Sequence, residues 1–480
     1  MTDTAQGREY DVVVVGGGPT GENVASRAVE GGLTAVLVEH ELLGGECSYW
    51  ACMPSKALLR DTEVLAEAAA LPGAAAAVTG RVDVRAVLDR RDAFTSHWRD
   101  DGQVAWAEGA GIAVVRGHGR LAGERRVVVE GAYEGSQPLE LRARHAVVLA
   151  TGSVAAVPPV PGLREARPWT SREATSAEQV PEHLVVVGGG VVGCEMSTAW
   201  SRLGARVTLL NRGDRLLPGL EPFAGELVAQ RLRDGGVDVR LGASPAAVRR
   251  DGDGPTTVVL EDGAEVTGDA LLVATGRRPA TADVGLDAVG LEPGSYLDVD
   301  DTLRVAGVPW LYAAGDCNGR NLLTHMGKYQ ARCCADAVVA RSRGEQASPD
   351  DRWARWTATA DAGACPSVVF ADPQVGTVGR TEAAAREAGL RVRCVEVDLN
   401  GVSGASLLGD DDAGRAKLVV DEDRRVVVGA TFAGRGTAEL LHSATVAVVG
   451  EVPLERLWHA VPSYPTVSEA WLRLLEAYGL

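Results

Sequence analysis

Residues 10–21 read YDVVVVGGGPTG, and this stretch decides the fold of the first part of the chain. Its apolar half ends in a glycine-rich turn that a helical pattern follows, so it predicts a strand, a tight turn and a helix. Gly16, Gly18 and Gly21 have the G-x-G-x-x-G spacing, which lets a backbone approach a pyrophosphate at a helix N-terminus. The next apolar run, TAVLVEH, contains Glu39, 39 − 21 = 18 residues after the last glycine. An acid there holds ribose hydroxyls, so we predict a βαβ unit that binds a dinucleotide.

The same pattern returns in residues 184–193, LVVVGGGVVG. Gly188, Gly190 and Gly193 repeat the glycine spacing, and a helical stretch and a strand, RVTLLNR, follow. This is a second βαβ unit with a second dinucleotide site. Two such sites in one chain indicate a resident flavin and a nicotinamide coenzyme that binds and leaves.

The second site lacks the acid of the first. Asn211 ends its second strand, with Arg212 next and Arg215 beyond. An acid would bond the free 2′-hydroxyl of NADH, whereas arginine suits a 2′-phosphate. The residues favour NADPH, with NADH possible; the alternative is that both arginines belong to a solvated loop edge.

The remaining segments predict an α/β protein with two Rossmann-like domains and a C-terminal α+β domain. Two short strands end in Thr-Gly, AVVLATG at 146–152 and LLVATG at 271–276. A third ends in AAGDCNG at 313–319 and leads into a helical pattern. Beyond about residue 350, strand patterns such as PSVVF and RRVVVGATF alternate with helical ones.

Composition excludes several classes of protein. The 480 residues carry a net charge of 48 − 65 = −17, which argues against a nucleic-acid or anionic-membrane partner. The first residues show no signal-peptide pattern and no apolar run is long enough to span a bilayer, so we expect a cytoplasmic protein. Eight cysteines are too few for a disulfide scaffold, and in that compartment a close pair is more often catalytic or metal-binding.

Such a pair occurs in residues 44–59, GGECSYWACMPSKALL. In a regular helix, positions five apart are roughly 140° out of phase and more than about 7 Å apart. A Cys47–Cys52 disulfide therefore needs either a distorted backbone or a helix that begins near Cys52, where Pro54 fits the first turn. A thiolate at such an N-terminus is nucleophilic. A zinc site would need further ligands at metal spacing and none is near, so we predict a redox-active pair and no metal.

Together these motifs resemble the pyridine nucleotide–disulfide oxidoreductases, the flavoenzyme family of dihydrolipoamide dehydrogenase, glutathione reductase and mercuric reductase. The resemblance covers nearly the whole chain, through GGGPTG, GGECSYWACMPSK, ATG, GGGVVGCE, ATGRRP, AAGDCNG and PSVVFADPQVGTVG. It implies a homodimer whose active site is shared across the interface. It also implies an FAD-binding domain at 1–157, an NAD(P)-binding domain at 158–280, a return segment completing the FAD domain at 281–345, and a dimerisation domain at 350–480.

By the same resemblance, electrons pass from the nicotinamide to the flavin, then to the disulfide and then to a substrate. Cys52 would lie against the flavin as the charge-transfer thiolate, and Cys47 would face the substrate. Lys56 and Glu195 would pair near flavin N5, where they would steady the charge that develops as hydride arrives.

The resemblance also assigns the other cofactor contacts. Asp316 would bond the flavin ribityl chain. The helix that starts near Leu323 would point its N-terminus at the flavin, with Thr324 and His325 there; a plain packing role is an equal alternative for His325. The further cofactor-binding positions are Gly45, Lys56, Gly119, Thr151, Gly152 and Gly276.

One departure from the family concerns its catalytic base. The family has a C-terminal His-Pro-Thr-x-Ser-Glu motif, in which the partner subunit supplies the His and the Glu orients it. Here Tyr464 stands at the His position, while Glu469 is kept. Unperturbed His titrates near pH 6.5 and Tyr near about pH 10, so Tyr464 is an acid or hydrogen-bond donor at neutral pH. Two alternatives are that His459 substitutes through a shifted backbone, or that Tyr464 is a buried tyrosine at the dimer contact.

Other departures concern the cysteines. No cysteine follows Cys394, so the extra C-terminal redox pair of mercuric reductase and the large thioredoxin reductases is absent. Cys333 and Cys334 are adjacent in a helical pattern, where side chains diverge by about 100°, and we predict core thiols. Tyr49 and Trp50 are bulky and would either narrow access to the pair or stack on a planar acceptor.

We therefore predict an FAD-dependent NAD(P)H oxidoreductase that uses a Cys47–Cys52 disulfide. Its acceptor would be a small-molecule oxidant: a disulfide, or another electrophile such as a quinone or a metal ion. One alternative is a dihydrolipoamide dehydrogenase with an atypical base. Another is a flavin-bearing redox sensor with little turnover.

Overall fold

The computed structural model describes residues 8–131, 137–409 and 414–480. The chain forms two compact units. Unit one comprises the described residues of Met1–Met53, Asp92–Val154 and Arg277–Asp361, and unit two those of Pro54–Arg91, Ala155–Gly276 and Ala362–Leu480. Each unit holds one of the two glycine motifs. The predicted boundaries are those of functional domains, whereas these units are defined by compactness. The domain boundaries therefore stay a prediction.

Unit one is built on a seven-stranded sheet in the order β3-β2-β1-β6-β5-β4, with β16 also paired to β6. Strands β3, β2, β1, β6 and β16 run parallel to one another. Strands β5 and β4 pair with their neighbours in the antiparallel direction. Val12–Val15 are buried. The helix Pro19–Glu30 packs against β1 and β2, and β4 lies over Val15, since a Cβ on Gly119 would lie 3.2 Å from the Val15 side chain. The strands are β1 (Arg8–Val15), β2 (Ala35–Glu39), β3 (Ala113–Arg116), β4 (His118–Leu121), β5 (Arg126–Glu130), β6 (Leu139–Leu149) and β16 (Leu311–Ala313).

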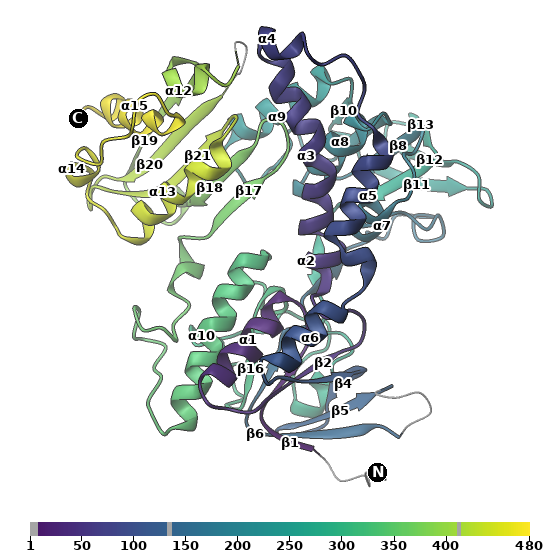
Figure 1. The fold of residues 1–480 in the computed structure, drawn as a ribbon, viewed down its shortest axis with the longest axis vertical. Helices are drawn as coiled ribbons and strands as arrows, with labels where there is room; N and C mark the ends of the chain where they lie inside the picture. The colour runs from purple at the N-terminus through teal and green to yellow at the C-terminus, as the bar shows by residue number, and fades with distance from the viewer. Residues whose placement is uncertain (1–7, 132–136, 410–413) are drawn as a thin grey trace. The chain divides into compact units, whose positions relative to one another are not determined.

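Two helices of unit one, α1 (Pro19–Glu30) and α10 (Thr324–Ser342), lie side by side (Figure 1). Arg27 Nε donates to Asp336 Oδ1 at 2.9 Å across their contact. Near the end of α1, a Cβ on Gly31 would lie 2.5 Å from the Val339 side chain, so the two backbones approach closely. Near the start of both helices, a Cβ on Gly327 would collide with Thr20 Oγ1, so the first turns of α1 and α10 also lie close together.

The other elements of unit one are short. They are α2 (Gly45–Tyr49), α6 (Asp101–Gly109), the strand pair β7 (Ser153–Ala155) and β15 (Arg277–Pro279), and one-turn 3-10 helices at Ser96–Trp98, Leu286–Val289, Asp316–Asn318 and Thr359–Ala362. Helix α3 (Cys52–Ala69) begins in unit one and continues in unit two, where α4 (Pro72–Ala75) and most of α5 (Val84–Phe94) follow.

Unit two contains the second glycine motif in a four-stranded parallel sheet, β10-β9-β8-β14. Trp200 on α8 is fully buried there, and its Nε1 donates to Ala174 O at 3.1 Å. A three-stranded antiparallel sheet, which the sequence patterns did not predict, adjoins it. These elements are α7 (Ser171–Ser176), β8 (His183–Val187), α8 (Val191–Arg202), β9 (Arg206–Asn211), α9 (Pro222–Asp234), β10 (Asp238–Leu241), β11 (Pro245–Arg250), β12 (Thr256–Leu260), β13 (Glu265–Gly268) and β14 (Ala270–Val273).

The C-terminal part of unit two is a five-stranded antiparallel sheet in the order β17-β18-β21-β20-β19. Helix α13 packs on β18 and β21. The elements are β17 (Pro366–Val369), β18 (Val375–Gly379), α11 (Glu382–Glu387), β19 (Val392–Asp398), α12 (Ser403–Ser406), β20 (Arg415–Asp421), β21 (Val426–Ala433), α13 (Thr437–Val449), α14 (Leu454–Leu457) and α15 (Ala470–Tyr478), with 3-10 turns at Leu399–Gly401 and Val467–Glu469.

This architecture confirms the predicted fold class, with two Rossmann-like βαβ regions and a C-terminal α+β region. Cys333 and Cys334 lie buried on α10, which confirms the predicted core thiols. No helix among the described residues is long and apolar enough to cross a membrane.

Candidate functional site

The three glycines of the first motif serve two different purposes. A Cβ on Gly16 would collide with Ala150 O, and a Cβ on Gly21 would collide with Gly16 O, so internal packing excludes side chains at both positions. Gly18 is different, because a Cβ there would meet nothing closer than the Cα of Gly45, 3.8 Å away. Gly18 caps α1 without any side-chain hydrogen bond. The open space at Gly18 and the free N–H groups of α1 fit the pyrophosphate of a dinucleotide.

Glu39 fixes the loop of this motif. Its Oε2 accepts from Gly17 N at 2.7 Å, and its Oε1 accepts from Glu41 N at 2.8 Å. Burial would raise the pKa of the Glu39 carboxyl, but hydrogen bonds from His40 and these two N–H groups lower it overall. Glu39 therefore stays an anionic acceptor at neutral pH, as the ribose contact requires.

The three glycines of the second motif serve the same two purposes. Side chains at Gly188 and Gly193 would collide with Ala274 O and Gly188 O, whereas a Cβ on Gly190 would meet nothing within 4 Å. Gly190 caps α8 without a side-chain hydrogen bond. This N-terminus also has room for a phosphate. The structure thus provides two sites whose shape fits a dinucleotide.

Asn211 takes the structural place of Glu39 in the second motif. Its Oδ1 accepts from Gly189 N at 3.1 Å, as Glu39 accepts from Gly17 N. Its Nδ2 donates to Gly213 O at 3.0 Å and to Arg215 O at 2.9 Å. The Asn211 amide therefore forms hydrogen bonds with the loop backbone and carries no negative charge. These bonds shape the turn that carries the exposed Arg212.

The two cysteines of the predicted redox pair lie on separate helices. Cys47 is in α2, which ends at Tyr49, and Cys52 is the first residue of α3. The helical path is broken at Trp50 (φ −138°, ψ 5°). Of the two arrangements that the sequence allowed, the structure therefore has the helix that begins near Cys52. Both cysteines are free thiols, and Cys52 Sγ lies 3.4 Å from Thr324 Oγ1 at the start of α10.

The Cys47 thiol is hard to ionise. A hydrogen bond with Cys52 and burial raise the pKa of Cys47 far above its ordinary value. A hydrogen bond with Thr324 and the charge of Lys328 act in the opposite direction. The two sulfurs and the Thr324 hydroxyl thus form one coupled group, and reaction at Cys47 requires that its proton be removed.

Lys56 and Glu195 form an ion pair within unit two. Lys56 Nζ donates to Glu195 Oε2 at 2.7 Å, and Glu195 Oε1 accepts from Phe370 N at 2.9 Å. Glu195 is 3% exposed, so its charge is held by these two donors. Lys56 follows Cys52 by one helical turn on α3, so both side chains extend from one face of that helix.

Asp316 belongs to a cluster in unit one that the sequence patterns did not reveal. Ser153 Oγ donates to Asp316 Oδ2 at 2.5 Å. Arg277 donates from Nε to Ser153 Oγ and from Nη2 to Ser153 O, both at 2.6 Å. The same guanidinium lies 3.7 Å from Glu46, the neighbour of Cys47. Arg277 thus ties the turn that carries Asp316 to the helix that carries Cys47.

Other predicted cofactor positions have varied environments. A Cβ on Gly45 would lie 2.7 Å from Gly18 Cα, and one on Gly119 would lie 3.0 Å from Val38, so both glycines permit close packing. Gly152 (φ +72°) and Gly276 (φ +130°) require backbone conformations that suit glycine, with open space beside each. His325 is exposed at the start of α10 rather than packed in the core, and Thr151 is half-buried.

The C-terminal segment does not form a local acid–base pair. Tyr464 is 76% exposed, and His459 is also exposed. Glu469 is buried, and its Oε1 accepts from Arg473 Nη2 at 2.8 Å. Among the described residues, Glu469 therefore pairs with arginine and not with Tyr464.

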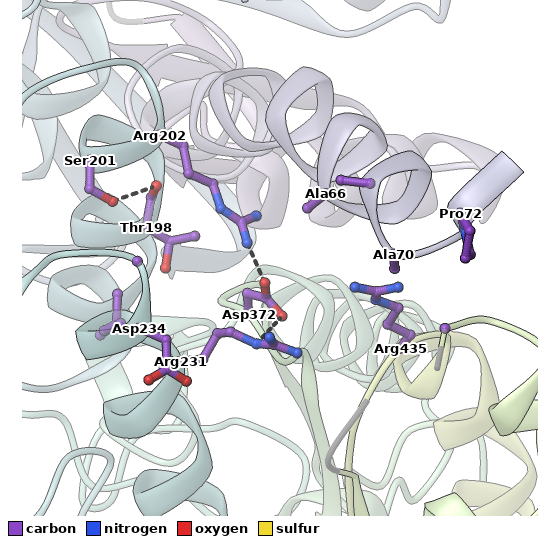
Figure 2. A pocket seen from close by; sticks show the side chains of 14 residues that line it. Ala66, Ala70, Pro72, Thr198, Ser201, Arg202, Arg231, Asp234, Asp372 and Arg435 are labelled. Atoms are coloured by element: carbon purple, nitrogen blue, oxygen red, sulfur yellow. Dashed lines mark hydrogen bonds and ion pairs between the residues drawn. The ribbon is translucent and has the colours of Figure 1, made fainter. Parts of the chain in front are cut away.

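A cavity of about 570 Å³ lies elsewhere in unit two, and Figure 2 shows its lining. The Arg202 side chain forms an ion pair with Asp372, and Arg231 Nε lies 3.7 Å from the same carboxylate. Because these guanidinium groups share one carboxylate, the cavity wall is an ion-pair network rather than a free cationic site. A neighbouring cavity of about 430 Å³ has Lys56 and Phe370 in its wall.

Comparison with known proteins adds to this geometry. Residues 10–342 match the family model described as pyridine nucleotide-disulphide oxidoreductase, and residues 365–475 match the dimerisation domain of that family. The chain belongs to the pyridine nucleotide-disulphide oxidoreductases. Its resemblance to this family and its enzyme class are thus confirmed. The family uses FAD and a pyridine nucleotide, and both glycine motifs fit that requirement.

Several relatives of this oxidoreductase match over almost its whole length. It is 32% identical to a dihydrolipoyl dehydrogenase of Haloferax volcanii, covering 99% of this chain and 97% of the relative. It is also 32% identical to a mercuric reductase of Shigella flexneri, covering 95% of this chain and 79% of the relative. Among solved structures, LpdA of Mycobacterium tuberculosis has a TM-score of 0.82 at 25% identity, covering 98% and 100% of the two chains. The flavoprotein disulfide reductase RclA of Escherichia coli, in a Cu(II) complex, has a TM-score of 0.82 at 24% identity, covering 98% and 99%, which shows a shared fold.

The sequence did not indicate three residues that lie near the predicted site: Glu22, Ser153 and Arg277. Glu22 follows the last glycine of the first motif directly, and this adjacency was the one available signal. Ser153 and Arg277 are 124 residues apart, so no local pattern could join them.

Proposed function

We propose that this chain is an NADPH-dependent flavoprotein that transfers electrons through Cys47 and Cys52 to a small-molecule disulfide. The observation that carries the proposal is the arrangement of the two thiols, on the adjoining ends of two helices and in hydrogen-bond contact. Two neighbouring thiols can exchange between dithiol and disulfide. When bound, FAD supplies the two-electron carrier between the pyridine nucleotide and this pair.

The residues of the chain have distinct roles in this proposal. Cys52, at the start of α3 and beside Thr324, is the flavin-side thiolate, because a helix N-terminus favours negative charge. Cys47 is the thiol that attacks the acceptor. Lys56, held by the buried Glu195, would present its ammonium to a bound flavin, where a positive charge favours acceptance of electrons. Asp316, oriented by Ser153, would hold the ribityl hydroxyls.

The coenzyme is NADPH in this proposal. Asn211 replaces the carboxylate that would accept a hydrogen bond from a ribose 2′-hydroxyl, and all its polar atoms bond loop backbone. Arg212 is exposed on the same turn and suits a 2′-phosphate. These two features favour NADPH over NADH.

The proposed enzyme works as a homodimer in the cytoplasm. The family's dimerisation domain matches residues 365–475, which supports dimer formation. The exposed Tyr464 and Val461 give the C-terminal segment an apolar surface that a second copy would cover. In this proposal the segment with Tyr464 completes the substrate side of the partner's site.

A second candidate is dihydrolipoamide oxidation, the reverse direction of disulfide chemistry. The full-length similarity to a dihydrolipoyl dehydrogenase favours it. Tyr464 argues against it, since that direction must remove a thiol proton and a phenol is a poor proton acceptor at neutral pH.

Anaerobic reductive titration tests the proposed relay. A working relay takes up four electrons per subunit and shows a long-wavelength charge-transfer band at the two-electron stage. A flavin-bearing sensor without a relay takes up two electrons and shows no band. Cys394→Ser, which changes a thiol of the C-terminal sheet, is the matched control and should behave like the parent. Uptake of only two electrons by the parent would refute the proposal.

The acceptor is then found by steady-state assays with NADPH. Lipoamide, glutathione disulfide, quinones, Hg(II) and Cu(II) are compared with one enzyme preparation. The proposal expects a disulfide to give the highest kcat/KM. Turnover of quinones that is unchanged in Cys47→Ser would instead assign electron transfer directly from the flavin.

A further inference from the structure

Three successive residues of unit one, Ser96, His97 and Trp98, have a left-handed backbone conformation. Their φ angles are +51°, +53° and +53°. In L-residues this conformation brings Cβ close to the following carbonyl oxygen, so only glycine adopts it freely. Elsewhere among the described residues, non-glycine residues with positive φ occur one at a time. Such strain persists only where surrounding contacts impose it, and it is concentrated at functional sites.

The strained turn directs the Trp98 side chain at the segment between the two thiols. Trp98 Nε1 donates to Tyr49 O at 3.1 Å. Tyr49 is the last residue of α2, and the last carbonyls of a helix have no partner within that helix. The indole therefore caps α2 directly before the break at Trp50. The capped carbonyl is two residues after Cys47 and three residues before Cys52.

Asp100, two residues after Trp98, holds the other end of the same segment. Its Oδ2 accepts from Leu43 N at 2.7 Å and also from Arg116 Nη2, which belongs to β3 of the main sheet. Tyr49 OH donates to Leu43 O at 3.0 Å and closes the segment on itself. Trp98 and Asp100 thus hold the segment from Leu43 to Tyr49 at both ends.

Packing alone does not require this arrangement. Trp98 is only half-buried, whereas Tyr49, to which it bonds, is 1% exposed. An indole that merely filled space could do so from an ordinary backbone conformation. A hydrogen bond instead fixes both the place and the direction of the N–H group, because its strength falls steeply as the angle departs from linear. The strain at residues 96–98 is therefore matched to the bond with Tyr49.

We propose that Trp98 is a positioning residue of the Cys47–Cys52 pair, and that its cap on α2 holds the helix break in the form that keeps the two thiols together. This inference rests on the proposed electron relay and concerns the balance between its dithiol and disulfide forms. A disulfide allows only a narrow range of Cα–Cα distances and dihedral angles, whereas two thiols tolerate a wide range. A hold on the break restricts mainly the dithiol, so it favours the disulfide and makes the pair harder to reduce.

Redox titration of the pair tests the inference. Holoenzyme is equilibrated anaerobically with mixtures of reduced and oxidised dithiothreitol, quenched with acid and alkylated, and mass spectrometry gives the disulfide fraction of Cys47 and Cys52. Reduction of the pair breaks one S–S bond and takes two electrons and two protons, which dithiothreitol supplies as its own disulfide closes. Trp98→Phe keeps an aromatic ring and removes the donor. Its equilibrium should move about tenfold toward the dithiol, the effect of one hydrogen bond, which raises the midpoint potential by about 30 mV.

Trp106→Phe, at an exposed tryptophan of α6, is the matched control and should titrate like the parent. Hydrogen–deuterium exchange of the peptide that spans residues 43–51 is a second measurement. It should be faster in Trp98→Phe and unchanged in Trp106→Phe. His97→Gly should keep the parent potential, because glycine retains the left-handed turn that directs the indole.

A parent-like potential in Trp98→Phe overturns the inference. Faster exchange without a change in potential overturns it too, since the contact would then be merely structural. Should Trp98→Phe fail to fold, Asp100→Ala releases the other end of the segment and should also raise the potential; a parent-like value there overturns the inference as well. A parent enzyme that forms no Cys47–Cys52 disulfide at any ratio overturns the proposed function, whereas a parent disulfide whose potential does not move in Trp98→Phe overturns this inference alone.

Discussion

Replacement of Glu22 by Gln should stabilise the protein at alkaline pH. The pKa of Glu22 rises from 4.5 to about 7 in the folded chain, with burial as the largest cause. The folded state therefore holds a proton that the unfolded state has already released, and stability falls as the pH rises from about 4.5 through 7. A difference of about 2.5, at about 1.36 kcal/mol for each pKa unit, gives about 3 kcal/mol as the upper limit. Glutamine carries no charge and avoids this loss.

Urea unfolding of the holoenzyme at pH 5 and pH 8 measures the effect, with fixed protein and excess FAD. The stability advantage of Glu22→Gln over the parent should grow by about 2.5 kcal/mol between the two values, because the unfolded carboxyl is already largely ionised at pH 5. Glu30→Gln, on the exposed end of the same helix, should show no such growth. An advantage for Glu22→Gln that is the same at both pH values would refute the assigned burial of the carboxylate.

The remaining predictions concern the relay, the coenzyme, the base and the core. Cys52→Ser should abolish the charge-transfer band and keep FAD bound; a band that survives would assign the flavin-side thiolate elsewhere. Arg212→Glu should lower the NADPH-to-NADH ratio of kcat/KM by about tenfold to a hundredfold, the loss of one charged hydrogen bond, and an unchanged ratio would contradict a 2′-phosphate contact. Tyr464→His should raise dihydrolipoamide oxidation if the missing base limits it, whereas no change would point to restricted access to the thiols. Trp200→Ala should lower the free energy of unfolding by about 3–5 kcal/mol because it leaves a cavity in unit two, and a loss below about 1 kcal/mol by urea unfolding would contradict that packing.

The sequence predicted those features that depend on contacts between near neighbours. The two glycine motifs were visible because a tight turn, a helix start and an acid or amide about 20 residues later are all read from one βαβ unit. The break in the helix at Trp50 could not be predicted uniquely. The spacing of Cys47 and Cys52 allowed either a distorted backbone or a helix that begins near Cys52. The Ser153–Arg277 contact and the burial of Glu22 depend on segments that come together only in the folded chain, so local patterns carried no signal for either.

Glu39 and Asn211 hold their two glycine turns through the same contact. Each side chain closes its loop by accepting a backbone N–H of the glycine turn, yet one carries a charge and the other does not. Exchange of the Asn211 carboxamide for a carboxylate would therefore keep the acceptor for Gly189 N but lose the two hydrogen bonds that Nδ2 donates to Gly213 O and Arg215 O. The charge at this position and the path of the loop beyond it would change together.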